Sequence, residues 1–168
     1  DLEQNTILDE IKGNEKILEI GCGDGRNSIN MVKKYNSVSI DAFDFSRGMI
    51  NLAKRNAKQE EIKNIFFFTF DINDLHKIGN TYDLVISKRA LINLESYKKQ
   101  INAIENIAQL LNVDGFFLMC ENSQNGLKNI NQARMMLSLP EIIMPWHNKY
   151  FEESILEEDV KSLTLLKK

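Results

Sequence analysis

The stretch from residue 16 to residue 26, KILEIGCGDGR, decides the fold class, because a short apolar run ends directly in a glycine-rich turn. The run Lys16–Ile20 is typical of a buried strand. Glycines in the turn let the backbone bend sharply and approach a ligand closely. A helix predicted over residues 27–35 then points its free N-terminal N–H groups toward the turn. In an open α/β sheet, ligands bind beyond the carboxyl ends of the strands, so this turn is the first candidate binding site.

Strand and helix patterns alternate along the chain after this turn. The alternation predicts βαβ units, a mainly parallel sheet and helices on both of its faces, which is a three-layer α/β sandwich. After residue 121 the pattern loosens, and we expect helices over 127–139 and 152–159 and the start of a sixth strand over 163–166. The other expected strands cover residues 38–43, 65–70, 82–87 and 116–120, and the other expected helices lie around 49–53 and over 100–111.

Composition and charge exclude several classes of protein. Of the 168 residues 43% are apolar and 27% charged, which predicts a globular domain and excludes a disordered chain. The net charge of −3 argues against a nucleic-acid partner, and the lack of an apolar run of about 18 residues argues against a membrane span. Cys22 and Cys120 form no CxxC pair and no Cys/His cluster, so we expect no metal site and a reduced, cytoplasmic location.

Acidic residues follow two of the expected strands. Asp44 follows the second strand, where a carboxylate can accept hydrogen bonds from a ribose diol. Asp71 follows the third, where its side chain could accept a hydrogen bond from the exocyclic amine of an adenine. Acids at strand ends also serve as turn residues or helix caps, so either one alone would be weak evidence. Arg26 stands where a dinucleotide fingerprint requires glycine or alanine, which argues against a nicotinamide-dependent oxidoreductase.

Four motifs in order resemble those of the class I S-adenosylmethionine-dependent methyltransferases. They are ILEIGCGDG at 17–25, DAFDFSRGM at 41–49, FTFDIND at 68–74 and YDLVISKRALINL at 82–94. The resemblance implies a Rossmann-like α/β fold, S-adenosyl-L-methionine as cofactor and S-adenosyl-L-homocysteine as product. It also implies a seven-stranded sheet whose last strand is antiparallel. At most one further strand fits at the end of this chain, so we expect the C-terminal strands to be incomplete and the chain to lack part of its native tail.

The resemblance also assigns residues to parts of the cofactor. Glu19, Gly21 and Gly23 would surround its methionine part. Asp44 would hold the ribose, with Met49 beside the ribose or the adenine. The full predicted cofactor-binding set is Glu19, Gly21, Cys22, Gly23, Asp44, Phe45, Met49, Asp71, Ile72 and Ser87.

Within that set, Asp71 and Ile72 would hold the adenine, and Ser87 would lie under the sulfonium.

We expect one domain over 1–168, with a cofactor-binding core over 1–121 and a substrate-side segment over 122–168.

Fewer residues of the sequence indicate what the methyl acceptor is. Methyl transfer from a sulfonium depends largely on positioning, although an oxygen acceptor often also needs a general base. The loop over 87–90 lacks the prolines of amino-methylating DNA enzymes and the cysteine of cytosine-C5 enzymes, which argues against both. Arg89 in this loop could bind a phosphate or carboxylate of the acceptor. A histidine can exchange a proton near neutral pH, so His147 is the candidate general base.

The segment over 121–150 is similar to segments of small bacterial methyltransferases associated with surface-polysaccharide pathways. Trp146 and Tyr150 in it could stack on a sugar or nucleotide ring. We therefore expect O-methylation of a small anionic acceptor, such as a nucleotide-linked sugar, with Arg89 and His147 as catalytic residues. Two alternatives stay open: a non-catalytic binding or scaffold subunit with this fold, and a nicotinamide-dependent oxidoreductase.

Overall fold

The computed structural model describes residues 2–166, which form two compact units. The first unit contains the residues up to Lys88 together with Asn106–Cys120. The second contains Arg89–Glu105 and the residues from Glu121 onward. No helix among the described residues is long and apolar enough to cross a membrane.

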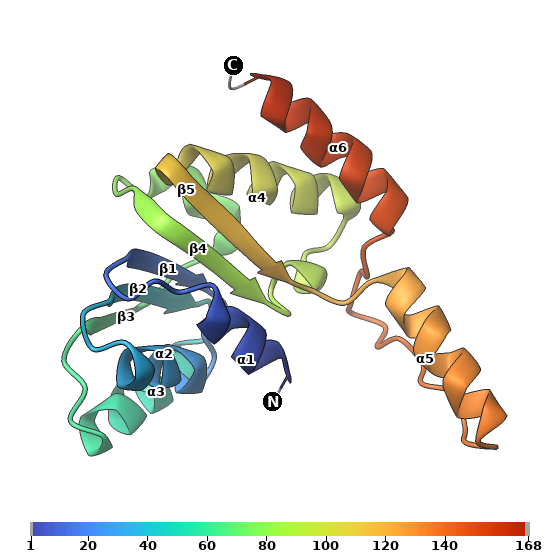
Figure 1. Cartoon of the computed structure of the whole chain (residues 1–168), viewed down its shortest axis with the longest axis horizontal. Helices are drawn as coiled ribbons and strands as arrows, with labels where there is room; N and C mark the ends of the chain where they lie inside the picture. Colours follow the sequence, from blue (N-terminus) through green and yellow to red (C-terminus); the bar gives the residue numbers. More distant parts are fainter. Residues whose placement is uncertain (1, 167–168) are drawn as a thin grey trace. The chain divides into compact units, whose positions relative to one another are not determined.

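A five-stranded sheet of order β3-β2-β1-β4-β5 forms the centre of the first unit (Figure 1). Every neighbouring pair of strands is parallel, which confirms the predicted α/β fold. The chain runs outward from β1 through β2 to β3 and then crosses to β4 on the other side, so the strand order reverses between β1 and β4. The strands are β1 Lys16–Ile20, β2 Ser39–Asp44, β3 Ile65–Thr69, β4 Tyr82–Lys88 and β5 Leu111–Cys120.

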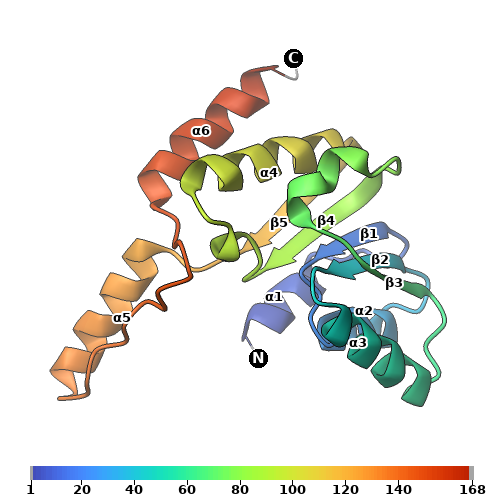
Figure 2. The same ribbon diagram turned by 180° about the vertical axis from the view of Figure 1, so that it is seen from behind.

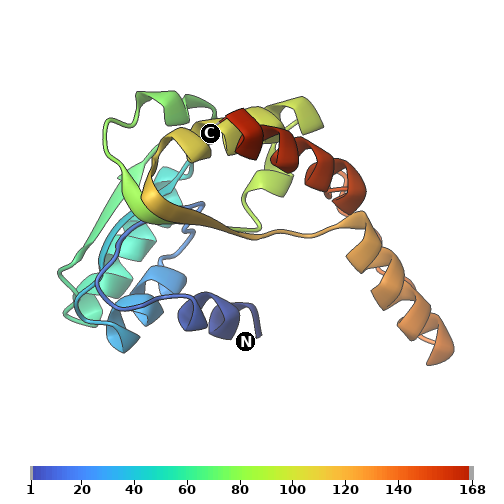
Figure 3. The same cartoon turned by 45° about the horizontal axis from the view of Figure 1, so that its top comes forward.

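Helices cover both faces of this sheet, as the alternating pattern predicts (Figure 3). One face carries α1 (Leu2–Asp9), α2 (Arg26–Lys34) and α3 (Arg47–Gln59). The other carries the 3₁₀ helix η1 (Ile72–Lys77) and the end of α4 (Tyr97–Gln109). The central strands β1 and β4 are largely apolar on both sides because most of their residues are buried. A core of aliphatic side chains from β1, β2 and β4 packs against α1, α2 and α3.

The described residues contain five parallel strands and no antiparallel one, so the C-terminal strands are incomplete, as expected. One expectation about strands is wrong. The backbone over 163–166 is helical, as part of α6 (Glu153–Leu166). The α6 sequence is rich in leucine and glutamate, which are strong helix formers. A short apolar run such as 163–166 does not by itself distinguish a strand from a helix.

The fifth strand begins earlier than the sequence predicts. β5 starts at Leu111, which pairs with Tyr82, and Leu84 then pairs with Phe116 after an irregularity. Asp114 lies within that irregularity at a φ of 63°. Aspartate tolerates this left-handed conformation better than most residues, so the Asp-Gly signal marks a distortion within the strand and not its start.

Hydrogen bonds to the backbone join separate segments of the second unit, which also buries apolar side chains such as Leu91 and Phe151. It contains η2 (Leu91–Asn93), α5 (Gln124–Met136) and α6. The Glu121 carboxylate accepts hydrogen bonds from the N–H groups of Ala90 and Leu91, each at 3.0 Å. Buried Gln100 donates to the carbonyl oxygens of Leu91 and Lys149, at 3.1 and 2.7 Å.

Glu15 fixes the loop that leads into β1. The buried Glu15 carboxylate, directly before β1, accepts from the backbone N–H groups of Lys12, Gly13 and Asn14 at 2.6–3.0 Å. Burial alone would raise the pKa of Glu15, but these hydrogen bonds together hold it below its ordinary value.

Glu15→Gln should therefore lower the free energy of unfolding by about 1–3 kcal/mol at neutral pH, because charge-assisted hydrogen bonds are lost. A depressed pKa gives stability that is present above the ordinary value of 4.5 and is lost as the pH falls through the folded-state value. The difference between wild type and variant should thus shrink on acidification in urea unfolding. Glu10→Gln at an exposed position is the control, and an equal effect there would contradict the assignment.

Candidate functional site

The carboxyl ends of four strands meet at one edge of the sheet. Ile20 at the end of β1 pairs with Phe43 on one side and with Ser87 on the other. Asp44 at the end of β2 pairs with Thr69 at the end of β3. The segments that follow these strands therefore emerge side by side, which brings together the turns that the sequence motifs predict.

The glycine-rich turn between β1 and α2 depends on its left-handed backbone. Gly21, Gly23 and Gly25 have φ values of 70°, 55° and 78°, a region that favours glycine. A Cβ on Gly25 would lie 2.8 Å from the Phe67 ring and 2.9 Å from the Ala53 side chain, so this glycine lets α2 pack closely on the core. Apart from its chain neighbours, a Cβ on Gly23 would meet no atom of the described residues within 4 Å. The turn is thus closed at Gly25 and open at Gly23.

Asp44 joins this turn to the end of β2. The residue is 9% exposed, and its Oδ2 accepts a hydrogen bond from the Gly23 N–H at 3.0 Å. Its Oδ1 accepts from the Ser46 N–H at 2.8 Å. An ionised carboxylate has about four lone-pair sites, so the group can still accept hydrogen bonds from a ligand diol beside the open glycine.

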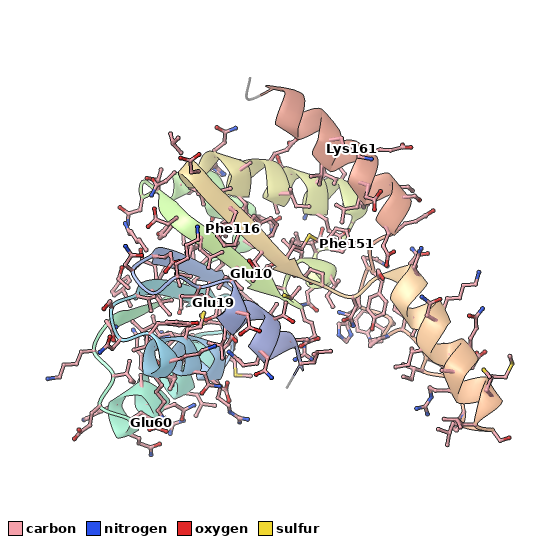
Figure 4. The ribbon with its side chains drawn as sticks, viewed as in Figure 1. Glu10, Glu19, Glu60, Phe116, Phe151 and Lys161 are labelled. Carbon is pink, nitrogen blue, oxygen red and sulfur yellow. The ribbon has the colours of Figure 1, made fainter. Side chains whose placement is uncertain are left out.

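Glu19 is a buried carboxylate on the β1 side of the same turn (Figure 4). It accepts hydrogen bonds from the Asn27 amide at 2.8 Å and from the Ser28 hydroxyl, both at the start of α2. Burial raises its pKa above the ordinary value, although these two bonds and the charge of Lys88 act in the opposite direction. The Asn27 Oδ1 atom is buried and accepts no hydrogen bond from residues 2–166. A buried carboxylate and an unsatisfied carbonyl oxygen together suit a cationic hydrogen-bond donor.

Cys22 and Ser87 are buried in the same region. Burial, with the carboxylates of Glu19 and Asp44 nearby, raises the pKa of the Cys22 thiol strongly, so the thiol stays protonated at neutral pH. Its side chain belongs to the apolar core, and its backbone N–H donates to the Phe43 carbonyl at 2.9 Å. Ser87 is fully buried near the end of β4.

The remaining predicted cofactor residues are more exposed. The Asp71 Oδ1 accepts from the backbone N–H and the side-chain amide of Asn73 at 2.9 and 2.8 Å, and so caps η1, which begins at Ile72. This is the structural role that an acid at a strand end also fills. Phe45 is 81% exposed and Met49 is 43% exposed, although both are large and apolar. Side chains of this kind at a binding edge suit the flat face of a base.

Arg89 and His147, the predicted acceptor-side residues, belong to the second unit, and their roles stay predictions. Arg89 has a φ of 53° and is exposed, and its carbonyl accepts from the Asn93 amide at 2.8 Å. His147 is exposed and its ring lies 5.4 Å from the Trp146 ring. Within the first unit, Lys88 forms an ion pair with Glu3 at 3.1 Å.

Asn27 and Ser28 are the site residues that sequence analysis missed. They interact with Glu19 only because the first turn of α2 stands over β1. Polar residues at a helix start carry no signal of such a contact, because they are common there for other reasons.

The chain is similar to known proteins in sequence and in fold. Residues 11–163 match the family described as Methyltransferase domain. The chain is 30% identical over 118 residues to malonyl-[acyl-carrier protein] O-methyltransferase from Bacillus anthracis, an alignment that covers 70% of this chain and 41% of that enzyme. The chain thus spans less than half the length of that relative.

Solved structures show the same fold. PKMT2 from Rickettsia typhi in complex with AdoHcy is 26% identical, with a TM-score of 0.63 over 76% of this chain and 25% of that one. TehB from Haemophilus influenzae has a TM-score of 0.72 at 21% identity, over 96% of this chain and 50% of that one. The likeness to TehB shows the fold alone.

The two glycines of the turn make a matched pair of substitutions. Gly23→Ala and Gly25→Ala should each cost about 1–2 kcal/mol of unfolding free energy, because alanine is strained at positive φ. Gly25→Ala should cost about 1–3 kcal/mol more, because its methyl group overlaps Phe67 and Ala53. Urea unfolding measures both, and equal losses would show that the turn does not pack as described.

Proposed function

Because the chain belongs to the methyltransferase domain family, we propose that its first unit binds S-adenosylmethionine at the carboxyl edge of the sheet and that the protein transfers the methyl group to an acceptor. The observation that carries the proposal is the open Gly23 beside the Asp44 carboxylate, at the end of a turn that Gly25 holds against the core. When bound, S-adenosylmethionine supplies a methyl group already activated on a sulfonium.

Asp44 would hold the ribose in this proposal. Its carboxylate is fixed by two backbone N–H groups, from Gly23 and Ser46, so its free lone pairs have a set direction. Gly23 leaves space for the ligand to approach the backbone. A fixed acceptor beside open backbone binds a diol without first losing side-chain freedom.

Glu19 and Asn27 would receive the cationic amino group of the methionine part. A protonated amine can donate to the Asn27 Oδ1, which accepts no other bond, and its charge would compensate the buried Glu19 carboxylate. Phe45 and Met49 would cover the adenine, with Asp71 and Ile72 at its edge and Ser87 below the sulfonium. Cys22 would contribute backbone and volume, because its protonated, core-packed thiol is a poor nucleophile.

We further propose an oxygen atom of a small anionic molecule as the acceptor, such as a phosphorylated or nucleotide-linked sugar. An O-methyltransferase among the relatives supports oxygen as the acceptor atom. Arg89 would bind the anionic group and His147 would take the proton that the acceptor hydroxyl loses. The same relative acts on an acyl group carried by a protein, which makes malonyl-loaded carrier protein the second acceptor to assay.

The test of the function has two stages. Isothermal titration calorimetry with S-adenosylhomocysteine, with NAD as control, should show binding of the first compound only. Transfer of radiolabelled methyl from S-adenosylmethionine is then measured with sugar phosphates, nucleotide sugars and malonyl-loaded carrier protein. Binding without transfer to any acceptor would favour a scaffold role, and preference for the carrier protein would replace the sugar.

Asp44→Asn should weaken S-adenosylhomocysteine binding about 10- to 100-fold, because one charged acceptor of the ribose diol is lost. Asp41→Asn is the matched control. Asp41 lies on the same strand, but its carboxylate accepts a hydrogen bond from the Tyr82 hydroxyl at 2.9 Å and has no role in the proposed ribose site. Calorimetry measures both affinities, and circular dichroism checks that both variants fold. Equal affinities for the two variants would remove Asp44 from the ribose site.

Glu19→Gln should weaken binding of S-adenosylhomocysteine while leaving the ligand-free fold at least as stable at neutral pH. The raised pKa of Glu19 means that the unfolded chain releases this proton first, so wild-type stability falls as the pH rises above the ordinary value of 4.5. Glutamine does not ionise, so the stability of the variant does not fall in this way. The free energy of unfolding of the variant, measured in urea at about pH 5 and about pH 8, should therefore rise relative to that of wild type at the higher pH. A variant that loses stability relative to wild type over this range would contradict the assignment.

A further inference from the structure

Strand β3 forms an outer edge of the sheet in the first unit (Figure 2). It pairs with β2 on one side only. At the two ends of this pairing, the Ile40 N–H donates to the Asn64 carbonyl at 3.0 Å and the Phe70 N–H donates to the Asp44 carbonyl at 3.1 Å. Alternate residues of a parallel strand bond to the same neighbour, so Ile65, Phe67 and Thr69 direct their backbone N–H and C=O groups away from β2. No strand of the described chain pairs with that side.

This edge lacks the features that normally protect an edge strand. Its sequence, IFFFT, contains no charged residue, proline or glycine, and its register with β2 is continuous without a bulge. Phe66 in the middle of the strand is 64% exposed and stacks on Phe68 with ring centroids 5.5 Å apart. Apolar, uncharged edges without a bulge pair readily with another strand.

A positively charged hollow lies beside the same edge. Its volume is about 620 Å³, and its apolar lining includes Phe66 and Phe67. Three lysines also line it: Lys54 and Lys58, which lie one turn apart on α3, and Lys63 in the loop before β3. Glu61 is the one acidic residue of the lining. Each lysine is exposed, and among the described residues none of the three takes part in an ion pair. The chain as a whole carries a net charge of −3, so this local positive charge is a distinct feature of the surface.

We propose that this surface, formed by β3, Lys54, Lys58 and Lys63 and named here the β3 edge site, binds an acidic, extended peptide segment of a partner protein. The peptide adds a strand beside β3 through the outward N–H and C=O groups of Ile65, Phe67 and Thr69, which gives affinity. Its carboxylates lie against the three lysines and its apolar side chains against the hollow, which gives selectivity. The directional row of backbone groups favours a peptide over an oligonucleotide, which has no matching pattern of donors and acceptors.

Fluorescence anisotropy with synthetic peptides tests the proposal. The probe is a labelled nine-residue peptide of alternating glutamate and valine, and we expect saturable binding at low salt. The same peptide with alternate backbone nitrogens methylated keeps its charge but cannot complete the strand, so its affinity should fall at least tenfold. A lysine–valine peptide should not bind.

Protein variants separate the two parts of the site. Lys54→Glu should weaken binding of the glutamate–valine peptide at least tenfold, whereas Lys98→Glu, an exposed lysine of α4 outside the hollow, should leave it unchanged. Thr69→Pro removes an outward N–H at a position where an edge strand tolerates proline and should also weaken binding. Affinity for S-adenosylhomocysteine is measured on Lys54→Glu in parallel and should stay unchanged, so the two proposals fail independently.

Four results would overturn the proposal. The first is equal affinity for the methylated and unmethylated peptides, which would reduce the site to a charged patch. The second is an absence of binding at about millimolar peptide. The third is tighter binding of a single-stranded oligonucleotide that Lys54→Glu abolishes. The fourth is self-association in sedimentation that Thr69→Pro abolishes, which would make a second copy of the chain the occupant.

Discussion

The hydrogen bond from the Gly23 N–H to the Asp44 carboxylate is the contact on which the geometry of the sheet's carboxyl edge depends. It joins the turn after β1 to the end of β2, two segments that parallel pairing brings side by side. Because the glycine holds a left-handed φ and the carboxylate also accepts from Ser46, both groups are fixed before any ligand arrives. The edge is therefore preorganised by backbone geometry, which lowers the entropy that binding would otherwise lose.

The buried Glu19 carboxylate shows a balance of a different kind. Taking a charge out of water is unfavourable, and two hydrogen bonds from the start of α2 offset only part of that cost, as the raised pKa indicates. The unsatisfied Asn27 oxygen beside it adds a second unfavourable term. In the proposed complex the amino group of the cofactor would supply the missing donor and charge, which would couple binding to local stability there.

Sequence patterns located most strands and helices because apolar runs, glycine-rich turns and caps are local signals. They failed where the signal was short or ambiguous, as at residues 163–166, which are helical, and at Asp114, which distorts β5 without starting it. The motifs also named the residues of the carboxyl edge, but not their mutual contacts. Asn27 was missed because its interaction with Glu19 exists only once α2 is folded back over β1.

The amino-acid sequence by itself determined the α/β class, the glycine-rich turn and the acids at the carboxyl ends of β2 and β3, because each depends on residue type and spacing along one segment. Only the tertiary structure decided which glycine faces open space and which faces the core, since that depends on Phe67 and Ala53 from other elements. It likewise decided that Asp71 caps η1 and that an uncharged β3 lies at a sheet edge beside three lysines. Burial, register and edge position arise from packing between distant segments, and no local pattern contains them.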